Sequence, residues 1–164
     1  MWEGDSDHPV TWSSRTYGSG GGMSIQFDMP EHQQKTVAEY LSKPGMPPSS
    51  SYTEGKRAYP DVSALGVSGT SQSAPILGGI LALIIDMRLN AGLPPLGCVA
   101  PRIYQVAENH PNEAFSDIIG GNSGLWCGDD TGFQATDGWD CNTGFGRPVW
   151  EGMVKYFGSD DNVI

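Results

Sequence analysis

Residues 68–75 read SGTSQSAP and lead directly into the apolar run ILGGILALII at residues 76–85. This pattern predicts a turn followed by a helix, and Pro75 suits the first helical turn because no backbone N–H is needed there. Ser71 would then lie at the positive end of a helix dipole, beside unpaired N–H groups. Such a serine is exposed, and its N–H can help to bind an oxyanion, as a nucleophile requires. The alternative is a serine that only caps a buried helix.

The helix after this turn is expected to span residues 72–89, with Asp86 and Arg88 at its solvent end. Gly78 and Gly79 lie inside it, and each costs roughly 1 kcal/mol in helix propensity relative to alanine. The glycine pair therefore predicts close packing against a neighbouring element. Burial of this helix is expected to supply much of the stability of the fold.

Periodicity and proline positions predict the other elements. These are a strand at residues 23–27, a loop at residues 44–51, and helices at residues 31–41, 101–107 and 149–157. Asp61 follows Pro60 and is expected to have a structural role in a turn.

The chain has 164 residues, 38% of them hydrophobic, which indicates one globular domain over residues 1–164 with an irregular lead at residues 1–16. Its net charge of −10 argues against partners such as nucleic acids and anionic membranes. The run at residues 76–85 falls short of the roughly 20 residues that a membrane span needs. Residues 1–5 do not resemble a signal peptide.

Four stretches, taken together, resemble the sedolisin family of serine-carboxyl peptidases over residues 17–157. Residues 68–75 resemble the nucleophile motif of that family. The other stretches match in the same order along the chain, and they are SGGGMS at residues 19–24, RAYPDVSA at residues 57–64, and FSDI at residues 115–118 followed by GWDCNTG at residues 138–144.

The resemblance implies an α/β fold, a subtilisin-like and mainly parallel sheet flanked by helices, here incomplete. It also implies that Ser71 is the nucleophile in peptide hydrolysis through an acyl-enzyme, in a secreted or lysosome- or vacuole-like acidic compartment. In the family the glutamate base and two aspartates lie upstream of the SGGG stretch, so an upstream part of the domain is expected as a partner. The family also has an additional segment near residues 65–67, which this chain lacks. This departure favours the alternative of a non-catalytic calcium-binding remnant.

The resemblance further implies one structural calcium ion. Calcium takes six to eight oxygen ligands, from carboxylates and backbone carbonyls. The residues at the positions of the family's calcium ligands are Asp117, Ile118, Thr136, Gly138 and Asp140. Ile118, Thr136 and Gly138 would contribute carbonyl oxygens, and Thr136 replaces a residue that is often glycine.

Two carboxylate pairs within the chain have the spacing of one helical turn. Glu3 and Asp7 are rejected as base and partner because the residues between them form a poor helix. Glu113 and Asp117 share the spacing, but Asp117 is assigned to the calcium loop.

Neither the histidines nor the cysteines indicate another kind of centre. His8 and His32 precede Ser71 without a subtilisin-type setting and are expected to be exposed, and His110 is expected in a loop. The three cysteines are Cys98, Cys127 and Cys141. Their spacing is not a zinc pattern, and an odd number leaves at least one thiol free, although Cys127 and Cys141 could pair.

Overall fold

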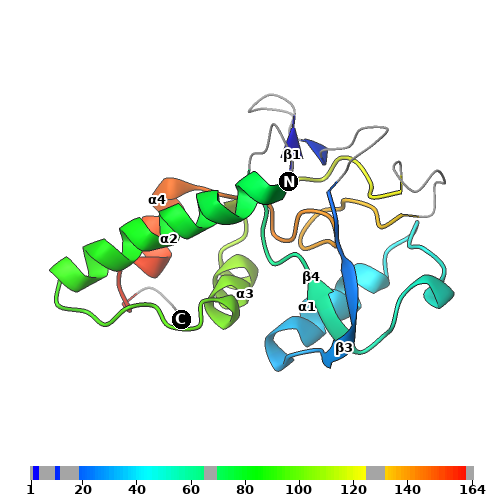
Figure 1. The fold of residues 1–164 in the computed structure, drawn as a ribbon, viewed down its shortest axis with the longest axis horizontal. Helices are drawn as coiled ribbons and strands as arrows, with labels where there is room; N and C mark the ends of the chain where they lie inside the picture. Colours follow the sequence, from blue (N-terminus) through cyan, green and yellow to red (C-terminus); the bar gives the residue numbers. More distant parts are fainter. Residues whose placement is uncertain (1, 4–9, 12–18, 65–69, 125–131, 162–164) are drawn as a thin grey trace.

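The computed structural model describes residues 2–3, 10–11, 19–64, 70–124 and 132–161 (Figure 1). The strands are β1 Trp2–Glu3, β2 Val10–Thr11, β3 Gly22–Asp28, β4 Lys56–Tyr59, β5 Phe115–Ser116 and β6 Arg147–Pro148. The α-helices are α1 Glu31–Leu41, α2 Ser73–Asn90, α3 Ala100–Asn109 and α4 Trp150–Phe157, and two short 3-10 helices are η1 Ser49–Ser51 and η2 Thr70–Gln72. The predicted helices and the predicted strand at residues 23–27 are therefore all present.

The described strands do not form the expected parallel sheet. They pair antiparallel in three two-stranded sheets, β1 with β2, β3 with β4, and β5 with β6. A parallel sheet needs several strands joined by crossover helices, and each of these strands has a single partner. Strands β1 and β2 fall in the stretch expected to be an irregular lead.

Helix α1 packs on the β3–β4 pair and on α3 (Figure 1). Its buried residues Gln33, Thr36, Val37 and Tyr40 recur at three- and four-residue intervals, which places them on one helical face. Tyr40 meets the Trp139 ring edge-on, with 5.5 Å between ring centroids. The loop that carries Trp139 is thereby fixed against α1.

Helix α2 is the element that departs most from expectation. Figure 1 shows it as a long rod along one side of the molecule, next to α4. Ile84 and Arg88 are its only buried residues, so burial of this helix contributes less to stability than expected. A methyl group added at Gly78 or Gly79 would meet no atom of the described chain within 4 Å, so the expected close packing is not found there. By length and composition alone, the helical stretch at residues 70–90 is long and apolar enough to cross a membrane. It is longer than the expected apolar run because it extends beyond residues 76–85 at both ends.

Arg88 lies inside the fold rather than at the solvent end of α2, with only 2% of its surface exposed. Its Nε donates to the Pro94 carbonyl oxygen at 2.8 Å, and Nη1 donates to the Phe157 carbonyl oxygen at 3.2 Å. Its guanidinium also pairs with Asp160. Arg88 therefore joins the end of α2 to the end of α4.

We expect Arg88→Ala to lower the free energy of unfolding by about 3 kcal/mol, because it empties a large buried site and leaves the buried Phe157 carbonyl without a donor. Denaturant unfolding measures this loss. Lys155→Ala is the control, since Lys155 pairs with Glu113 at the surface and such pairs contribute about 1 kcal/mol or less. Equal losses in the two variants would contradict the role given to Arg88.

His32 is not exposed as expected, whereas His110 lies in a bend directly after α3, in agreement with the expected loop. His32 is half-buried and meets the Tyr104 ring edge-on at 4.9 Å, and His110 stacks on Tyr156 at 4.4 Å. The thiol of Cys141 is buried and free. His8 and Cys127 lie outside the described residues.

Candidate functional site

The structure places Ser71 in η2, two residues before α2, with an exposed side chain. The residue at the N-cap of α2 is Gln72, and no side chain caps this helix end. Ser71 is therefore not the N-cap residue of α2, which was the alternative role considered for it. Residues 65–69, which include the first two residues of the SGTS motif, lie outside the described part.

The segment before this turn is attached to α2 by a side chain of the motif itself. The Ser73 hydroxyl donates to the carbonyl oxygen of Ala64 at 3.0 Å. Ala64 ends the RAYPDVSA stretch and is buried. The two motifs, separated in sequence by the undescribed residues, therefore meet in space.

A polar network around Asp61 fixes the RAYPDVSA stretch. Arg57 donates two hydrogen bonds to the Asp61 carboxylate, at 2.9 and 2.7 Å. The Tyr104 hydroxyl donates to the same carboxylate at 3.0 Å, and Gln33 donates to it at 3.3 Å. Asp61 thus has the structural role expected, and its partners come from β4, α1 and α3. Burial and the negative charge of Asp61 raise the pKa of Tyr104, which stays protonated as a donor.

The loop at residues 139–146 is hydrogen-bonded along the same stretch. Trp139 Nε1 donates to the Pro60 carbonyl oxygen at 2.9 Å. The Phe145 N–H donates to the Asp61 carbonyl oxygen at 3.0 Å, and the Ser63 N–H donates to Gly146 at 2.9 Å. The predicted calcium loop is therefore joined directly to the chain that leads into Ser71.

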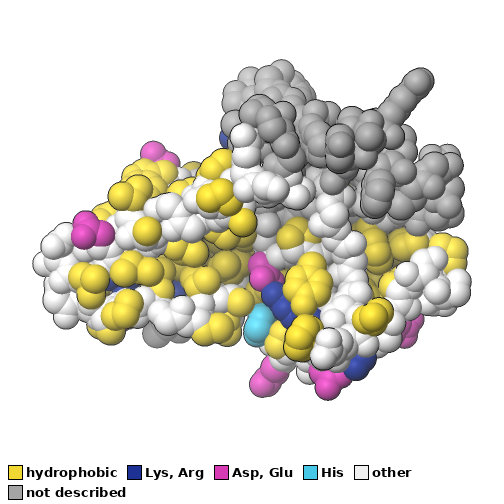
Figure 2. Space-filling model, in the orientation of Figure 1, with side chains coloured by type: hydrophobic (Ala, Val, Ile, Leu, Met, Phe, Trp, Pro, Cys, Tyr) yellow, Lys and Arg dark blue, Asp and Glu magenta, His cyan; other side chains and the backbone are white. Residues whose placement is uncertain are grey.

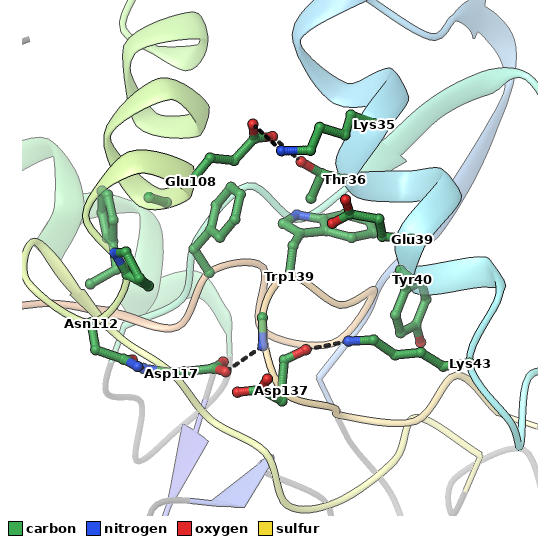
Figure 3. A pocket seen from close by; sticks show the side chains of 15 residues that line it. Lys35, Thr36, Glu39, Tyr40, Lys43, Glu108, Asn112, Asp117, Asp137 and Trp139 are labelled. Carbon is green, nitrogen blue, oxygen red and sulfur yellow. Dashed lines mark hydrogen bonds and ion pairs between the residues drawn. The ribbon is translucent and has the colours of Figure 1, made fainter. Parts of the chain in front are cut away.

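Asp117 follows β5 and is half-buried. One of its carboxylate oxygens accepts from the Ile118 N–H at 2.7 Å, and the other accepts from the Gly138 N–H at 2.6 Å. The second bond, drawn in Figure 3, spans 21 residues of sequence. The structure therefore brings together the two stretches that sequence analysis assigned to one metal site.

Asp140 is completely buried. Its Oδ2 accepts from the Thr136 N–H at 3.1 Å, and its Oδ1 accepts from the N–H groups of Asn142 and Thr143 at 2.7 and 2.8 Å. Burial raises the pKa of Asp140 to about 7, and the nearby charge of Asp117 contributes to the rise. Burial likewise raises the pKa of Asp117.

Thr143 is a residue that the sequence analysis did not single out. Its hydroxyl lies 3.2 and 3.3 Å from the two carboxylate oxygens of Asp140 and 3.4 Å from the carbonyl oxygen of Ile118. It thereby joins two of the predicted ligands. The sequence contained one signal for this contact. In GWDCNTG, an aspartate is followed two and three residues later by groups that can donate to its carboxylate.

The five predicted ligands are thus linked by hydrogen bonds among Asp117, Gly138, Thr136, Asp140 and Thr143, the last of which reaches Ile118. The two carboxylates lie near each other, and burial raises the pKa of each although backbone N–H groups donate to both. Among the described residues no group of three or more His, Cys, Asp or Glu side chains could hold a metal, so carbonyl and water oxygens would complete the set. An all-oxygen set of this kind fits calcium.

A cleft of about 370 Å³ opens between α1, α3 and the loop at residues 136–140 (Figure 3). Asp117, Asp137 and Gly138 lie on its loop side, and Ser71 does not line it. Lys43, two residues after the end of α1, donates to the Thr136 hydroxyl at 3.1 Å and to the Asp137 carbonyl oxygen. The cleft and the serine are therefore separate features on the chain.

Glu113, one of the other candidate acids, has partners other than Ser71. Glu113 accepts hydrogen bonds from Lys155 at 2.8 Å and from the Tyr156 hydroxyl at 2.5 Å. Glu3 lies in β1 rather than in a helix, and Asp7 is outside the described residues. Asp129 and Asp130 are outside them too.

No family model matches the chain. Among curated proteins it is similar to tripeptidyl-peptidase 1 of the dog, with 39% identity over 164 residues that cover 89% of this chain and 28% of the relative. The human tripeptidyl-peptidase 1 is 40% identical over 85% of this chain and 27% of its own length, and that of Dictyostelium discoideum is 36% identical over 84% and 25%. The chain therefore spans about a quarter of the length of these relatives.

The structure is similar to Pseudomonas sedolisin, a serine-carboxyl proteinase solved in complex with two molecules of pseudo-iodotyrostatin. The TM-score is 0.69 at 21% identity, and the match covers 96% of this chain and 45% of sedolisin. This likeness shows a shared fold, and the tripeptidyl-peptidase 1 relatives add sequence identity over most of the chain. The chain therefore belongs to the sedolisin family, of whose domain it spans a part.

Proposed function

We propose that this chain is part of an acid serine-carboxyl peptidase, that Ser71 is its nucleophile, and that its loop at residues 136–140 with Asp117 binds a structural calcium ion. The observation that carries the proposal is the position of Ser71, exposed in η2 at the start of α2, in a motif of the family. Its relatives are named tripeptidyl-peptidase 1, so the substrates are proposed to be peptides.

The Ser71 oxygen would attack the peptide carbonyl carbon, and the C–N bond would then break, releasing the amine with the proton that the base took from the hydroxyl and leaving an acyl-enzyme. Water would hydrolyse this ester, releasing the carboxylic acid and returning the proton to Ser71. Its own backbone N–H and the dipole of α2 favour the negative charge that develops on the carbonyl oxygen. A base must take the proton of the hydroxyl. Within the described part of the chain Ser71 has no hydrogen bond to a carboxylate or an imidazole, so we infer that other residues of the domain supply the base.

We expect the 164-residue chain alone to have little or no peptidase activity for the same reason. A chimera tests directly whether this chain can supply the nucleophile of a peptidase. In the chimera, this chain replaces the segment of human tripeptidyl-peptidase 1 that it matches over 158 residues. Cleavage of a peptide substrate at acid pH is expected in the chimera and is expected to fall to background with Ser71→Ala.

The control for this chimera is Ser51→Ala, because Ser51 is also an exposed serine of a 3-10 helix. It is expected to leave the activity of the chimera unchanged. Activity that survives Ser71→Ala would refute the role of Ser71 as nucleophile.

The calcium ion, when bound, would supply two positive charges to the buried carboxylates. Asp117 and Asp140 would hold it by carboxylate oxygens, and Ile118, Thr136 and Gly138 by carbonyl oxygens. Because the loop at residues 139–146 is hydrogen-bonded to the stretch before Ser71, holding this loop would also hold the nucleophile turn.

We expect added calcium to raise the melting temperature of the chain, and Asp117→Asn to abolish most of this rise because a ligand charge is lost. Asp86→Asn is the matched control, since Asp86 is an exposed carboxylate in α2 and does not belong to the loop. Thermal melts with calcium and with a chelator measure both. Calcium-independent melts of the unmodified chain would contradict the proposed site.

The second candidate is a calcium-binding remnant of the family without catalysis. The carboxylate cluster favours it as much as it favours the enzyme, and the chimera distinguishes the two. A remnant would give a chimera that is stabilised by calcium but does not cleave peptides.

A further inference from the structure

The cleft between α1, α3 and the loop at residues 136–140, here called the α1–α3 cleft, has no part in the proposed reaction, because Ser71 does not line it. None of the described residues that line it belongs to α2, so it is also separate from the hydrophobic side chains along that helix (Figure 2). Its volume of about 370 Å³ lies in the range of sites for small organic molecules. Four aromatic side chains, each at most 9% exposed, contribute to its lining, and they are Tyr40, Phe115, Trp139 and Phe145.

These rings offer the cleft apolar surface and π faces without a hydrogen-bond donor. Trp139 Nε1 donates to the Pro60 carbonyl oxygen at 2.9 Å, and the Tyr40 hydroxyl donates to the Gln134 carbonyl oxygen at 2.8 Å. Neither Pro60 nor Gln134 lines the cleft, so both donors are engaged outside it. The polar groups of a ligand must therefore find their partners among the charged side chains of the lining.

The charged side chains of the cleft carry an excess of negative charge. Four carboxylates face two ammonium groups, which gives a net charge of −2. Both ammonium groups already have oxygen partners. Lys35 pairs with Glu108 at 3.4 Å, and Lys43 donates to the Thr136 hydroxyl and to the Asp137 carbonyl oxygen. The cleft is therefore unfavourable for an anion.

Two of the four carboxylates are not engaged by the protein. Within the described part of the chain, the carboxylates of Glu39 and Asp137 accept no hydrogen bond and form no ion pair. By contrast, Glu108 is paired, and Asp117 accepts two backbone hydrogen bonds. Figure 3 shows Glu39 extending from α1 and Asp137 extending from the loop. Neither is a proposed calcium ligand, so both carboxylates stay available when that ion is bound.

We propose that the α1–α3 cleft binds a small organic ammonium ion with an apolar body. Its cationic group would pair with Glu39 and Asp137, and its body would lie on Trp139 and the neighbouring rings, whose π faces also attract a cation. An inorganic cation is less suitable, because among the described residues no group of three or more His, Cys, Asp or Glu side chains could hold one. A neutral ligand would leave both carboxylate charges without a partner.

Three probes with the same phenyl body separate charge from shape in the test. At neutral pH phenethylamine is a cation, phenethyl alcohol is neutral and hydrocinnamate is an anion. The full chain is titrated with each probe at saturating calcium, and the NMR resonance of the Trp139 indole N–H is followed. The amine is expected to bind about tenfold more tightly than the alcohol, because a charge-assisted contact is added. No binding is expected for the anion.

Glu39→Gln is expected to weaken the binding of phenethylamine about tenfold and to leave that of the alcohol unchanged, because only a charge is removed. Glu31→Gln is the matched control, since Glu31 is another exposed glutamate of α1 that does not line the cleft. It is expected to leave both affinities unchanged. Adding Asp137→Asn to Glu39→Gln is expected to remove the remaining preference for the amine. Melting temperatures of the variants show that each is folded.

Several results would overturn the proposal. One is equal affinity of the unmodified chain for the amine and the alcohol, or no binding of the amine. Another is an equal effect of Glu39→Gln and Glu31→Gln. Amine binding that leaves the Trp139 resonance unshifted would place the ligand elsewhere, and binding only after removal of calcium would place it among the metal ligands. These outcomes are independent of catalysis, because a chimera without peptidase activity would leave amine binding to the cleft unaffected.

Discussion

Gly144→Ala is expected to lower the free energy of unfolding by about 4 kcal/mol or more. Gly144 has a φ of +61°, and a methyl group there would lie 2.1 Å from the carbonyl oxygen of Asp61 and 2.6 Å from the nitrogen of Val62. Both are backbone atoms of the stretch that the network around Asp61 fixes, so they cannot move aside alone. The loop at residues 139–146 would have to separate from this stretch.

The control for this substitution is Gly55→Ala. Gly55 has a similar φ of +74°, but an added methyl group would meet nothing within 4 Å. The expected cost is therefore only the backbone term of about 1 kcal/mol. Denaturant unfolding followed by tryptophan fluorescence compares the two variants, and equal losses would show that the close approach of the loop is not as described.

The metal-free chain is expected to lose stability as the pH rises. Burial raises the pKa of Asp140 from 3.8 to about 7, so the folded chain keeps a proton that the unfolded chain has released. Stability is then full below the unfolded pKa and falls by up to about 4 kcal/mol as the pH rises from about 4 to about 7, above which it levels off. The raised pKa of Asp117 acts in the same direction.

Unfolding in a chelator at several pH values measures this slope. Asp140→Asn is expected to flatten it, because the amide has no charge to bury, although its NH₂ group cannot accept from Thr136. Calcium is expected to oppose the loss at neutral pH, since the cation stabilises both carboxylates in the ionised form. A metal-free chain that becomes more stable between about pH 4 and about pH 7 would refute the environment described for Asp140.

Local sequence predicted the elements well because their signals are local. Pro30 and the apolar periodicity of residues 31–41 determine where α1 begins and which face it buries, and α1 spans these residues in the structure. The same reasoning predicted α3 and α4 to within a few residues. The exposure of α2 was not predictable in this way, since a continuous apolar run does not say whether a neighbour is present to cover it.

The candidate site was predictable only in part. The motif placed Ser71 before a helix, and the resemblance placed Asp117 and Asp140 in one loop system. The partners that hold these residues were missed, because they are distant in sequence. Tyr104 reaches Asp61 from a position 43 residues away, and Trp139 reaches Pro60 from 79 residues away.

The sequence by itself determined the helices, the turn at Ser71 and the oxygen-rich stretches, because propensity, capping and periodicity act over a few neighbouring residues. Only the tertiary structure decided that Asp140 is buried near Asp117, that the buried Arg88 side chain joins α2 to the end of α4, and that one apolar face of α2 is exposed. Burial and desolvation depend on which distant segments pack together, and these raise the pKa of Asp140 and leave one apolar face of α2 exposed.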